Sequence, residues 1–308
     1  MNAKKLLIWT IRIALTLVVL YFLFRQVEKH WLSIADYDWH LNIWYVVLSV
    51  ICAEIALALF APMWRNHIDS FGYSVTYKEA YKVLYLSNLG RYVPGKIWQV
   101  LGILYLTRKK GIATEAAGAS FVILQMFTIP AALLVFAVSS VIEPRVYIHQ
   151  IDIFGPGTGY VVLGVIVLLS ATLILFPGPV LRMGNYVLRK ISRPEVTFKL
   201  DKIVALKLFV GYFFIWVVYG LAFWLFLLAV AGNSHPSIIA AIGIYCAAYQ
   251  VGYLMLFAPG GFGPRELVLG TLLMPFIGPI GPAVAIMARL WSILFETIAA
   301  LIAVKIKM

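Results

Sequence analysis

The sequence predicts an all-α polytopic membrane protein with seven to eight transmembrane helices and two re-entrant segments broken by glycine and proline. Of its 308 residues, 63% are hydrophobic and only 12% are charged, and the mean hydropathy is +0.93. Soluble domains carry about 25% charged residues. The apolar residues also gather in runs close to the roughly 20 residues that cross a hydrocarbon core of about 30 Å. Composition therefore excludes a soluble globular domain.

The apolar runs define the expected elements in chain order. Complete spans are predicted at 6–24, 41–64, 117–141, 160–176, 206–231, 238–258 and 283–304. The first run is too long for a signal peptide and lacks a small-residue cleavage site, so we expect a retained helix. Two further runs, 83–106 and 267–277, are interrupted or short. We treat 1–308 as one integral-membrane domain with halves 1–155 and 156–308.

Basic residues indicate the orientation of these spans. The loop between the fourth and fifth spans contains Arg182, Arg189, Lys190, Arg193, Lys199, Lys202 and Lys207. The positive-inside rule places this loop, and with it the N-terminus, on the cytoplasmic side of the membrane. We expect that membrane to be the cell inner membrane. The side of the C-terminus depends on whether 267–277 crosses. The net charge of +12 is mainly a topology signal and does not indicate nucleic acid binding.

Polar side chains recur at one depth inside the predicted spans. Arg12, Glu54, Gln125, Gln250 and Glu296 each lie within an apolar run. Ionisable residues inside membranes are costly and by default serve a function, so this layer predicts a polar cavity. The alternatives are structural: Arg12 can extend to the interface. Arg289 and Glu296, seven residues apart on one helical face, can form a structural pair between spans.

The first interruption, SNLGRYVPGKIWQVLG at 87–102, places two cations and a helix breaker in an apolar run. Pro94 removes a backbone donor, and Gly90 and Gly95 loosen the chain on both sides, so a straight helix is excluded. A break at membrane depth must be buried in protein or face a water-filled cavity. Because both flanks are expected in the cytoplasm, we predict a hairpin that enters and returns on that side.

The second interruption, FAPGGFGPRE at 257–266, repeats this pattern. Pro259, Gly260, Gly261, Gly263 and Pro264 precede Arg265 and Glu266. Paired breaks at corresponding positions of two halves are typical of transporters with a binding site near the midplane. The sequence thus indicates a faint two-fold internal repeat, whose symmetry can be inverted or parallel.

These breaks combine features that bind anions. A helix beginning near Gly95 or Pro264 presents free N–H groups and the positive end of its dipole. Arg91, Lys96 and Arg265 add full charges suited to phosphate, and Glu266 lies beside them. We expect these four residues to contact an anionic lipid head group. The structural alternative is that the arginines cap carbonyl groups or neutralise Glu266.

At these two motifs the sequence resembles the integral-membrane domain of lysylphosphatidylglycerol synthases and its stand-alone flippase-like relatives. The matching stretches are NLGRYVPGKIWQVLG, 88–102, and APGGFGPRE, 258–266, and the span pattern agrees over essentially the whole chain. The resemblance implies a lipid-translocating module; full-length relatives move aminoacylated phosphatidylglycerol between leaflets, and others occur beside isoprenoid-linked glycan pathways. Position 264 is proline where the family more often has an aliphatic residue.

The expected function is therefore a flippase-like protein that binds and translocates an anionic phospholipid or isoprenoid-phosphate lipid. The chain stops shortly after the last span, so we expect no aminoacyl-transferase domain and no enzyme activity. We expect no cofactor and no metal, because the histidines show no ligand spacing and no phosphate-binding loop occurs. Two alternatives remain: a membrane-embedded glycosyltransferase, suggested by Asp36 and Asp38 in the first outer loop, and an accessory subunit of a lipid- or glycan-modifying membrane enzyme.

Overall fold

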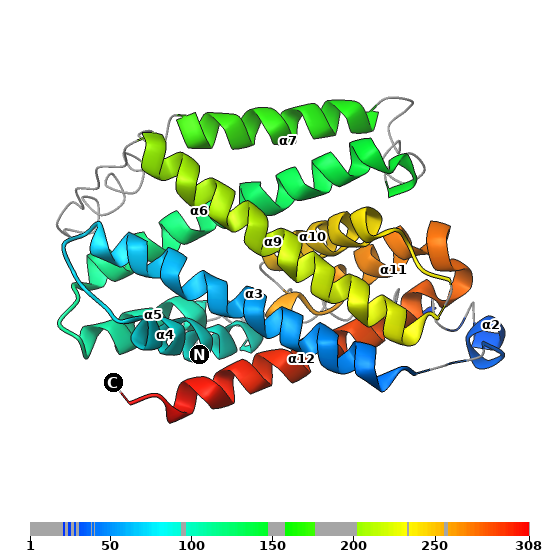
Figure 1. The fold of residues 1–308 in the computed structure, drawn as a ribbon, viewed down its shortest axis with the longest axis horizontal. Helices are drawn as coiled ribbons and strands as arrows, with labels where there is room; N and C mark the ends of the chain where they lie inside the picture. The colour runs from blue at the N-terminus through cyan, green and yellow to red at the C-terminus, as the bar shows by residue number, and fades with distance from the viewer. Residues whose placement is uncertain are drawn as a thin grey trace, which may run out of the picture.

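The computed structural model describes residues 21, 24–25, 28, 31–37, 39, 41–93, 97–146, 158–175, 202–232, 234–255 and 258–307. This part of the chain is helical and contains no strand, as predicted (Figure 1). Its helices are α2 (Trp31–Ala35), α3 (Ile43–Asp69), α4 (Tyr77–Asn88), η1 (Leu89–Tyr92), α5 (Ile97–Arg108), α6 (Thr114–Ile142), η2 (Pro144–Val146), α7 (Thr158–Leu175), α9 (Lys202–Val230), α10 (Ile238–Leu254), η4 (Pro259–Gly261), α11 (Pro264–Ile277), η5 (Gly278–Ile280) and α12 (Gly281–Lys305).

Four helices cross the molecule from end to end. Helices α3, α6, α9 and α12 contain 27, 29, 29 and 25 residues, and each carries an apolar stretch long enough to span a membrane. At about 1.5 Å per residue they are longer than the roughly 30 Å hydrocarbon core. The prediction of a multi-pass all-α membrane protein is confirmed.

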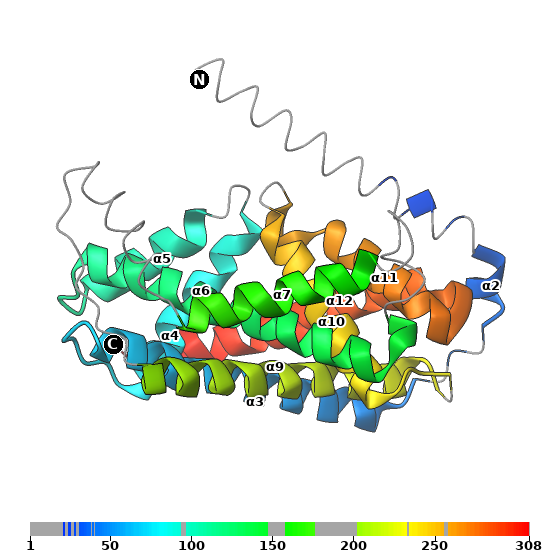
Figure 2. The same cartoon turned by 90° about the horizontal axis from the view of Figure 1, so that it is seen from above.

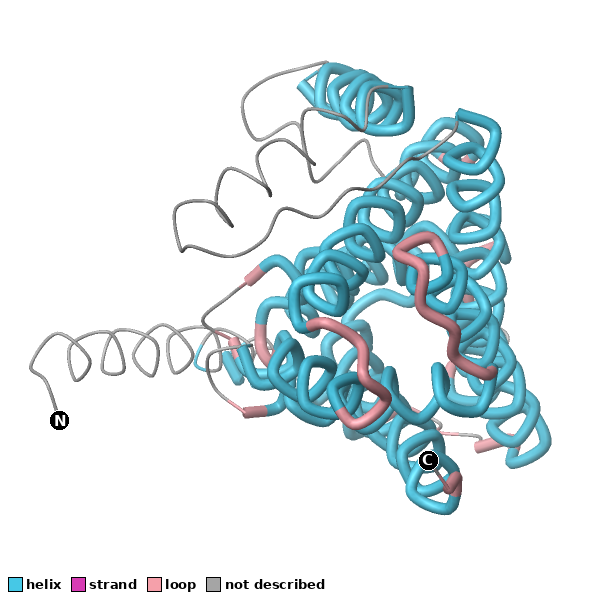
Figure 3. The backbone as a smooth tube through the Cα atoms, turned by 90° about the vertical axis from the view of Figure 1, so that its left-hand side faces the viewer, coloured by secondary structure: helices cyan, strands magenta, loops and turns pink. Residues whose placement is uncertain are grey.

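The bundle has two ends, which we call the α4 end and the α10 end after the helices that begin there. At the α4 end, Glu79 forms an ion pair with Lys110, and the Lys82 amine donates to the carbonyl oxygen of Ile306. At the α10 end, the Asn42 N–H donates to the carbonyl oxygen of Ala229 at 3.0 Å. Figure 3 looks onto the α4 end and shows that the chain finishes there, after α12.

One succession of helices occurs twice in the chain. A long helix, a short helix, a break, a short helix and a long helix appear as α3–α4–η1–α5–α6 and again as α9–α10–η4–α11–α12. The equivalent helices α3 and α9 pack side by side along one face (Figure 2). They run antiparallel, because Asn42 contacts Ala229 while the thiol of Cys52, further along α3, points at the carbonyl of Val218, earlier in α9. The internal repeat is therefore inverted.

The inverted repeat sends the two broken segments inward from opposite ends. Helices α4 and α5 form a hairpin whose base lies at the α4 end, and α10 and α11 form one whose base lies at the α10 end. The tips of the hairpins meet, since η1 contacts η4. That these hairpins re-enter the membrane stays a prediction, as do the boundaries of the two halves.

The second hairpin differs from the complete span expected at 238–258. Helix α10 ends at Leu254, and the chain continues through η4 into α11, which packs against α10. Because α11 returns to the α10 end, α12 begins there and finishes beside Lys82 at the α4 end. Helix α12 thus ends at the same end of the bundle as the base of the first hairpin.

Glycine is required at both hairpin tips for different reasons. Gly261 has φ +76°, and a Cβ there would lie 2.7 Å from the carbonyl oxygen of Gly252. Gly90 packs against the opposite arm of its own hairpin, where a Cβ would lie 2.6 Å from the carbonyl carbon of Trp98. A side chain at Gly261 is excluded by backbone strain and by contact with Gly252. A side chain at Gly90 is excluded by contact alone. The backbone is thus close-packed at these two glycines.

Candidate functional site

Five charged side chains converge where the hairpin tips meet. Arg91 comes from η1, Arg265 and Glu266 from the beginning of α11, and Arg289 and Glu296 from α12. Each is at most 6% exposed. Three arginines and two glutamates leave one positive charge in excess among these five residues. Buried charge is costly unless it is paired, so this excess favours an anion nearby.

Arg91 links the first half of the chain to the second. Its guanidinium forms an ion pair with Glu296 and donates through Nη1 to the hydroxyl of Tyr249 at 2.7 Å. The other carboxylate oxygen of Glu296 accepts from the hydroxyl of Tyr92 at 2.5 Å. Charge-assisted hydrogen bonds of this kind are strong and directional. The tip of the first hairpin is therefore fastened to α10 and α12.

Arg265 lacks such a carboxylate partner. Its Nη2 donates to the hydroxyl of Tyr245 at 3.1 Å and to Ser292 Oγ at 2.9 Å. The guanidinium lies over the rings of Tyr245 and Tyr249, at 5.2 and 4.9 Å from their centroids. Among the described residues it forms no ion pair. Neutral hydroxyls and aromatic faces position this cation without neutralising it.

Glu266 and Arg289 have a structural part in the second tip. Glu266 Oε2 accepts from the N–H of Gly263 at 2.5 Å, which caps α11, and Oε1 lies 3.7 Å from Arg289 Nη1. Arg289 Nη1 donates to the carbonyl oxygen of Gly260 at 3.0 Å. The Glu266 contact is the N3 half of a capping box, without the N-cap side chain that glycine lacks, and the Arg289 contact satisfies a carbonyl group of the tip. Glu266 lies beside Arg289 and lines neither of the cavities described next.

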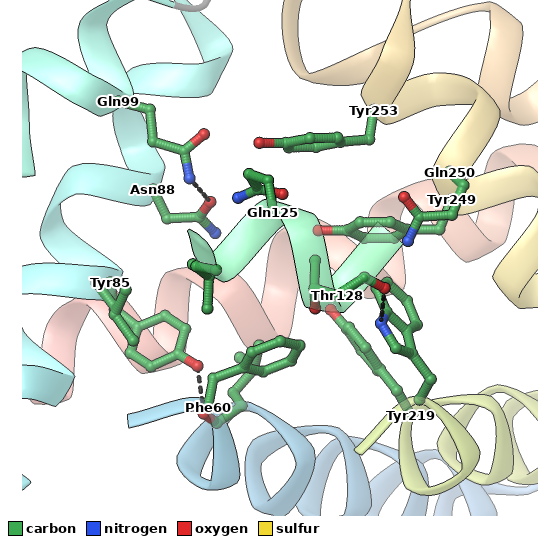
Figure 4. Close-up of a pocket in the computed structure, with 14 residues that line it drawn as sticks. Phe60, Tyr85, Asn88, Gln99, Gln125, Thr128, Tyr219, Tyr249, Gln250 and Tyr253 are labelled. Atoms are coloured by element: carbon green, nitrogen blue, oxygen red, sulfur yellow. Dashed lines mark hydrogen bonds between the residues drawn. The ribbon is translucent and has the colours of Figure 1, made fainter. Parts of the chain in front are cut away.

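Two adjoining cavities lie between the hairpins. The smaller, which we call the arginine cavity, has about 320 Å³ of empty space, part of it open to the outside, and is lined by Arg91 and Arg265 together with Gln99, Tyr249, Gly252, Tyr253 and Gly260. The larger, which we call the amide cavity, has about 620 Å³ of empty space, also partly open, between α3, α4, α5, α6, α9 and α10 (Figure 4). Gln99, Tyr249 and Tyr253 line both. The two cavities are therefore neighbours, separated or joined at these three side chains.

The polar residues expected inside the spans divide between these places. Gln125 and Gln250 come together in the amide cavity, on α6 and α10. Glu54 on α3 instead faces Tyr81 of α4. Arg289 and Glu296 do not pair with each other; each meets a partner from a hairpin tip. Arg12, Pro94, Gly95 and Lys96 lie outside the described residues, so their expected roles stay predictions.

Sequence reasoning missed the tyrosines that hold the arginines. Tyr245, Tyr249 and Tyr253 follow one another at intervals of four along α10, which places them on one helical face. The first two contact the guanidinium groups, and the last two line the cavities. Asn88 and Gln99 were also missed, although they flank the first break; the Gln99 amide donates to the Asn88 side chain at 3.2 Å. The regular tyrosine spacing was the available signal.

Long apolar helices, an inverted pair of broken hairpins and buried arginines at a cavity define the class: a polytopic membrane protein built from two inverted halves. The chain matches the model of one family, the lysylphosphatidylglycerol synthase TM region, over residues 9–302, and it belongs to that family. The resemblance noted at the two motifs is confirmed. The match concerns the membrane region of the family and links the chain to lipid modification or translocation. No curated protein sequence matches it.

Proposed function

We propose that this protein binds the phosphate of an anionic lipid in the arginine cavity and translocates that lipid across the cell inner membrane. The observation that carries the proposal is Arg265, a buried guanidinium held by hydroxyls and rings at a cavity that Arg91 also lines. A phosphate supplies the missing negative charge and accepts from both guanidinium groups. Family membership and the inverted hairpins support the same function.

The proposed orientation places the α4 end in the cytoplasm. Basic residues gather at that end, and they are Arg65, Lys78, Lys82, Arg108, Lys109, Lys110, Lys305 and Lys307. The positive-inside rule assigns such an end to the cytoplasmic side. Each hairpin then reaches the centre from a different face, an arrangement compatible with alternating access between inverted repeats. Labelling Lys109→Cys and Ser234→Cys with a membrane-impermeant maleimide tests this: we expect labelling from outside only at position 234.

Translocation is tested with the purified full chain in vesicles that contain a fluorescent anionic phospholipid. We expect the protein alone to expose inner-leaflet lipid to an external quencher. Arg265→Gln should reduce that rate at least about tenfold, because the cavity loses a cation that pairs with phosphate. Arg65→Gln is the matched control, since Arg65 is exposed and pairs only with Asp69 at the end of α3.

Two outcomes contradict the proposal. If Arg265→Gln and Arg65→Gln both translocate lipid at the rate of the unmodified chain, the arginine cavity is not the lipid site. If the unmodified chain translocates nothing in vesicles but a membrane enzyme acquires activity when the chain is present, the accessory role replaces translocation.

A further inference from the structure

The lining of the amide cavity has a distinct chemistry. None of its described lining residues carries a charge. Four of the lining side chains end in a carboxamide: Asn88, Gln99, Gln125 and Gln250. Each carboxamide offers both donors and an acceptor. Figure 4 shows Asn88 and Gln99 on one side of the space, Gln250 on the other and Gln125 between them. Such a lining suits a neutral ligand with several hydroxyl groups.

Gln250 gives the most direct indication of a ligand. It is only 1% exposed, and neither its amide nitrogen nor its amide oxygen has a hydrogen-bond partner among the described residues. The hydroxyl of Thr128, which lines the same cavity, likewise has no partner in that part of the chain. Leaving such buried polar groups unpaired is costly, because they have lost their hydrogen bonds to water. Hydroxyl groups that donate and accept would satisfy all three atoms.

Aromatic side chains complete the lining. Trp216 and Tyr249 pack edge to face at 5.0 Å, and Phe60, Tyr85 and Tyr219 also border the cavity. Aromatic faces provide apolar area with fixed geometry, and the few polar groups around them fix orientation. A ring that has hydroxyls at its edge and C–H groups on its face matches this combination of amides and aromatic surfaces.

The adjoining arginine cavity sets where the charge of the ligand lies. Gln99, Tyr249 and Tyr253 line both cavities, so a phosphate beside Arg91 and Arg265 would lie next to the amide cavity, within reach of its own ester substituent. A cationic substituent, such as a lysyl group, would meet no carboxylate in the described lining. The two buried glutamates nearby face Arg91 and Arg289 instead.

We propose that the ligand is a phosphate ester whose second substituent is an uncharged polyhydroxyl group, of the sugar or polyol class, with the phosphate in the arginine cavity and the hydroxyls on Gln250, Thr128 and the neighbouring amides. This inference rests on the proposed function for the presence of a phosphate, and it adds the chemistry of the head group. The same chemistry occurs in a lipid head group and in a soluble sugar phosphate.

The test measures binding to the purified full chain by quenching of tryptophan fluorescence, with four probes. Phosphatidylinositol carries phosphate and a neutral polyol, phosphatidic acid carries phosphate alone, and lysylphosphatidylglycerol adds a cation; inositol 1-phosphate is the soluble form. We expect phosphatidylinositol to bind at least about tenfold tighter than phosphatidic acid and lysylphosphatidylglycerol, since unpaired polar groups of a built site discriminate strongly.

Variants assign that preference to the amide cavity. Gln250→Leu and Thr128→Val should each reduce the preference for phosphatidylinositol over phosphatidic acid about tenfold, and affinity for phosphatidic acid should stay unchanged. Thr172→Val is the matched control, because Thr172 is an exposed threonine on α7 that lines neither cavity. Gln250→Glu should gain affinity for lysylphosphatidylglycerol, which keeps the test informative if Gln250→Leu does not fold.

The outcomes separate this inference from the proposed function. Equal affinity for the three lipids, lost in Arg265→Gln, would overturn the head-group class and leave anionic-lipid binding standing. Binding of none of the four probes would overturn both. Equal affinity for inositol 1-phosphate and phosphatidylinositol would uphold the head-group class and overturn the lipid as its source.

Discussion

The two hairpins share a topology but differ in how their tips are held. In the first, α4–η1–α5, Arg91 extends across the molecule to Tyr249 and Glu296 of the second half. In the second, α10–η4–α11, the tip is stabilised within its own half, by Glu266 and Arg289. The first tip thus takes its charged partner from the second half, and the second tip takes its charged partners from within its own half. The second half is therefore the frame against which the first hairpin is fixed.

This comparison also explains the difference between the arginines. Arg91 has a carboxylate partner from the opposite half, whereas Arg265 contacts hydroxyls and aromatic rings of its own half and forms no ion pair among the described residues. A buried cation without a paired carboxylate carries a larger electrostatic cost than a paired one. The two arginines that line one cavity thus differ in how the protein compensates their charge.

The largest effect is expected when the contact between the halves is broken. Glu296→Gln leaves the buried Arg91 without its counter-charge, and we expect a loss of about 3–5 kcal/mol in the free energy of unfolding. Thermal unfolding of the purified protein measures it. The double variant Arg91→Met with Glu296→Met should recover most of the loss, since no unpaired charge remains. A double variant as unstable as the single one would show that the pair does not carry the contact.

The second tip is tested at its glycines. Gly261→Ala combines a left-handed backbone with a contact on Gly252, whereas Gly111→Ala has nearly the same φ, +73°, with nothing within 4 Å of the added Cβ. We expect about 1–2 kcal/mol of destabilisation at Gly111 from backbone strain alone. At Gly261 the loss should be larger by a further 1–3 kcal/mol, roughly, from overpacking. Equal losses of unfolding free energy at the two positions would contradict the close packing of the tip.

The smallest effect is expected at the base of the first hairpin. The ion pair with Lys110 and the hydrogen bond from the Thr76 N–H lower the pKa of Glu79 below its ordinary value of 4.5. A lowered pKa in the folded state means that the stabilisation is complete above about pH 4.5 and is lost as the pH falls through the folded pKa. We expect Glu79→Gln to cost about 1 kcal/mol or less at pH 7, as typical of partly exposed pairs and helix caps.

The check for Glu79 is a pH series of unfolding measurements on both proteins. The difference in unfolding free energy between the unmodified chain and Glu79→Gln should be constant from pH 8 to pH 5 and shrink below it. A difference that instead grows as the pH falls would show that the ion pair does not lower the pKa of the Glu79 carboxylate.

Several features of this protein follow from the sequence by itself. The membrane class and the four long helices follow from the length of the apolar runs. The positions of both breaks follow from proline and glycine, which change the backbone locally. Gln125 and Gln250 were expected at one depth, because helical rise converts residue number into depth, and both line the amide cavity. The internal repeat could be predicted because a break rich in glycine and proline occurs at corresponding positions of the two halves.

Only the tertiary structure decided the direction of the repeat and the pairing of the charges. Whether the halves are inverted depends on the antiparallel packing of α3 on α9, and Arg91 meets Glu296 across 205 positions of the chain. Such contacts depend on helices that are distant in sequence, and no local pattern specifies them. The same reason separates Arg265 from Arg91, since both arginines stand beside a glycine-containing break. The fold brings a carboxylate to Arg91, and among the described residues it brings hydroxyl groups but no ion-pair partner to Arg265.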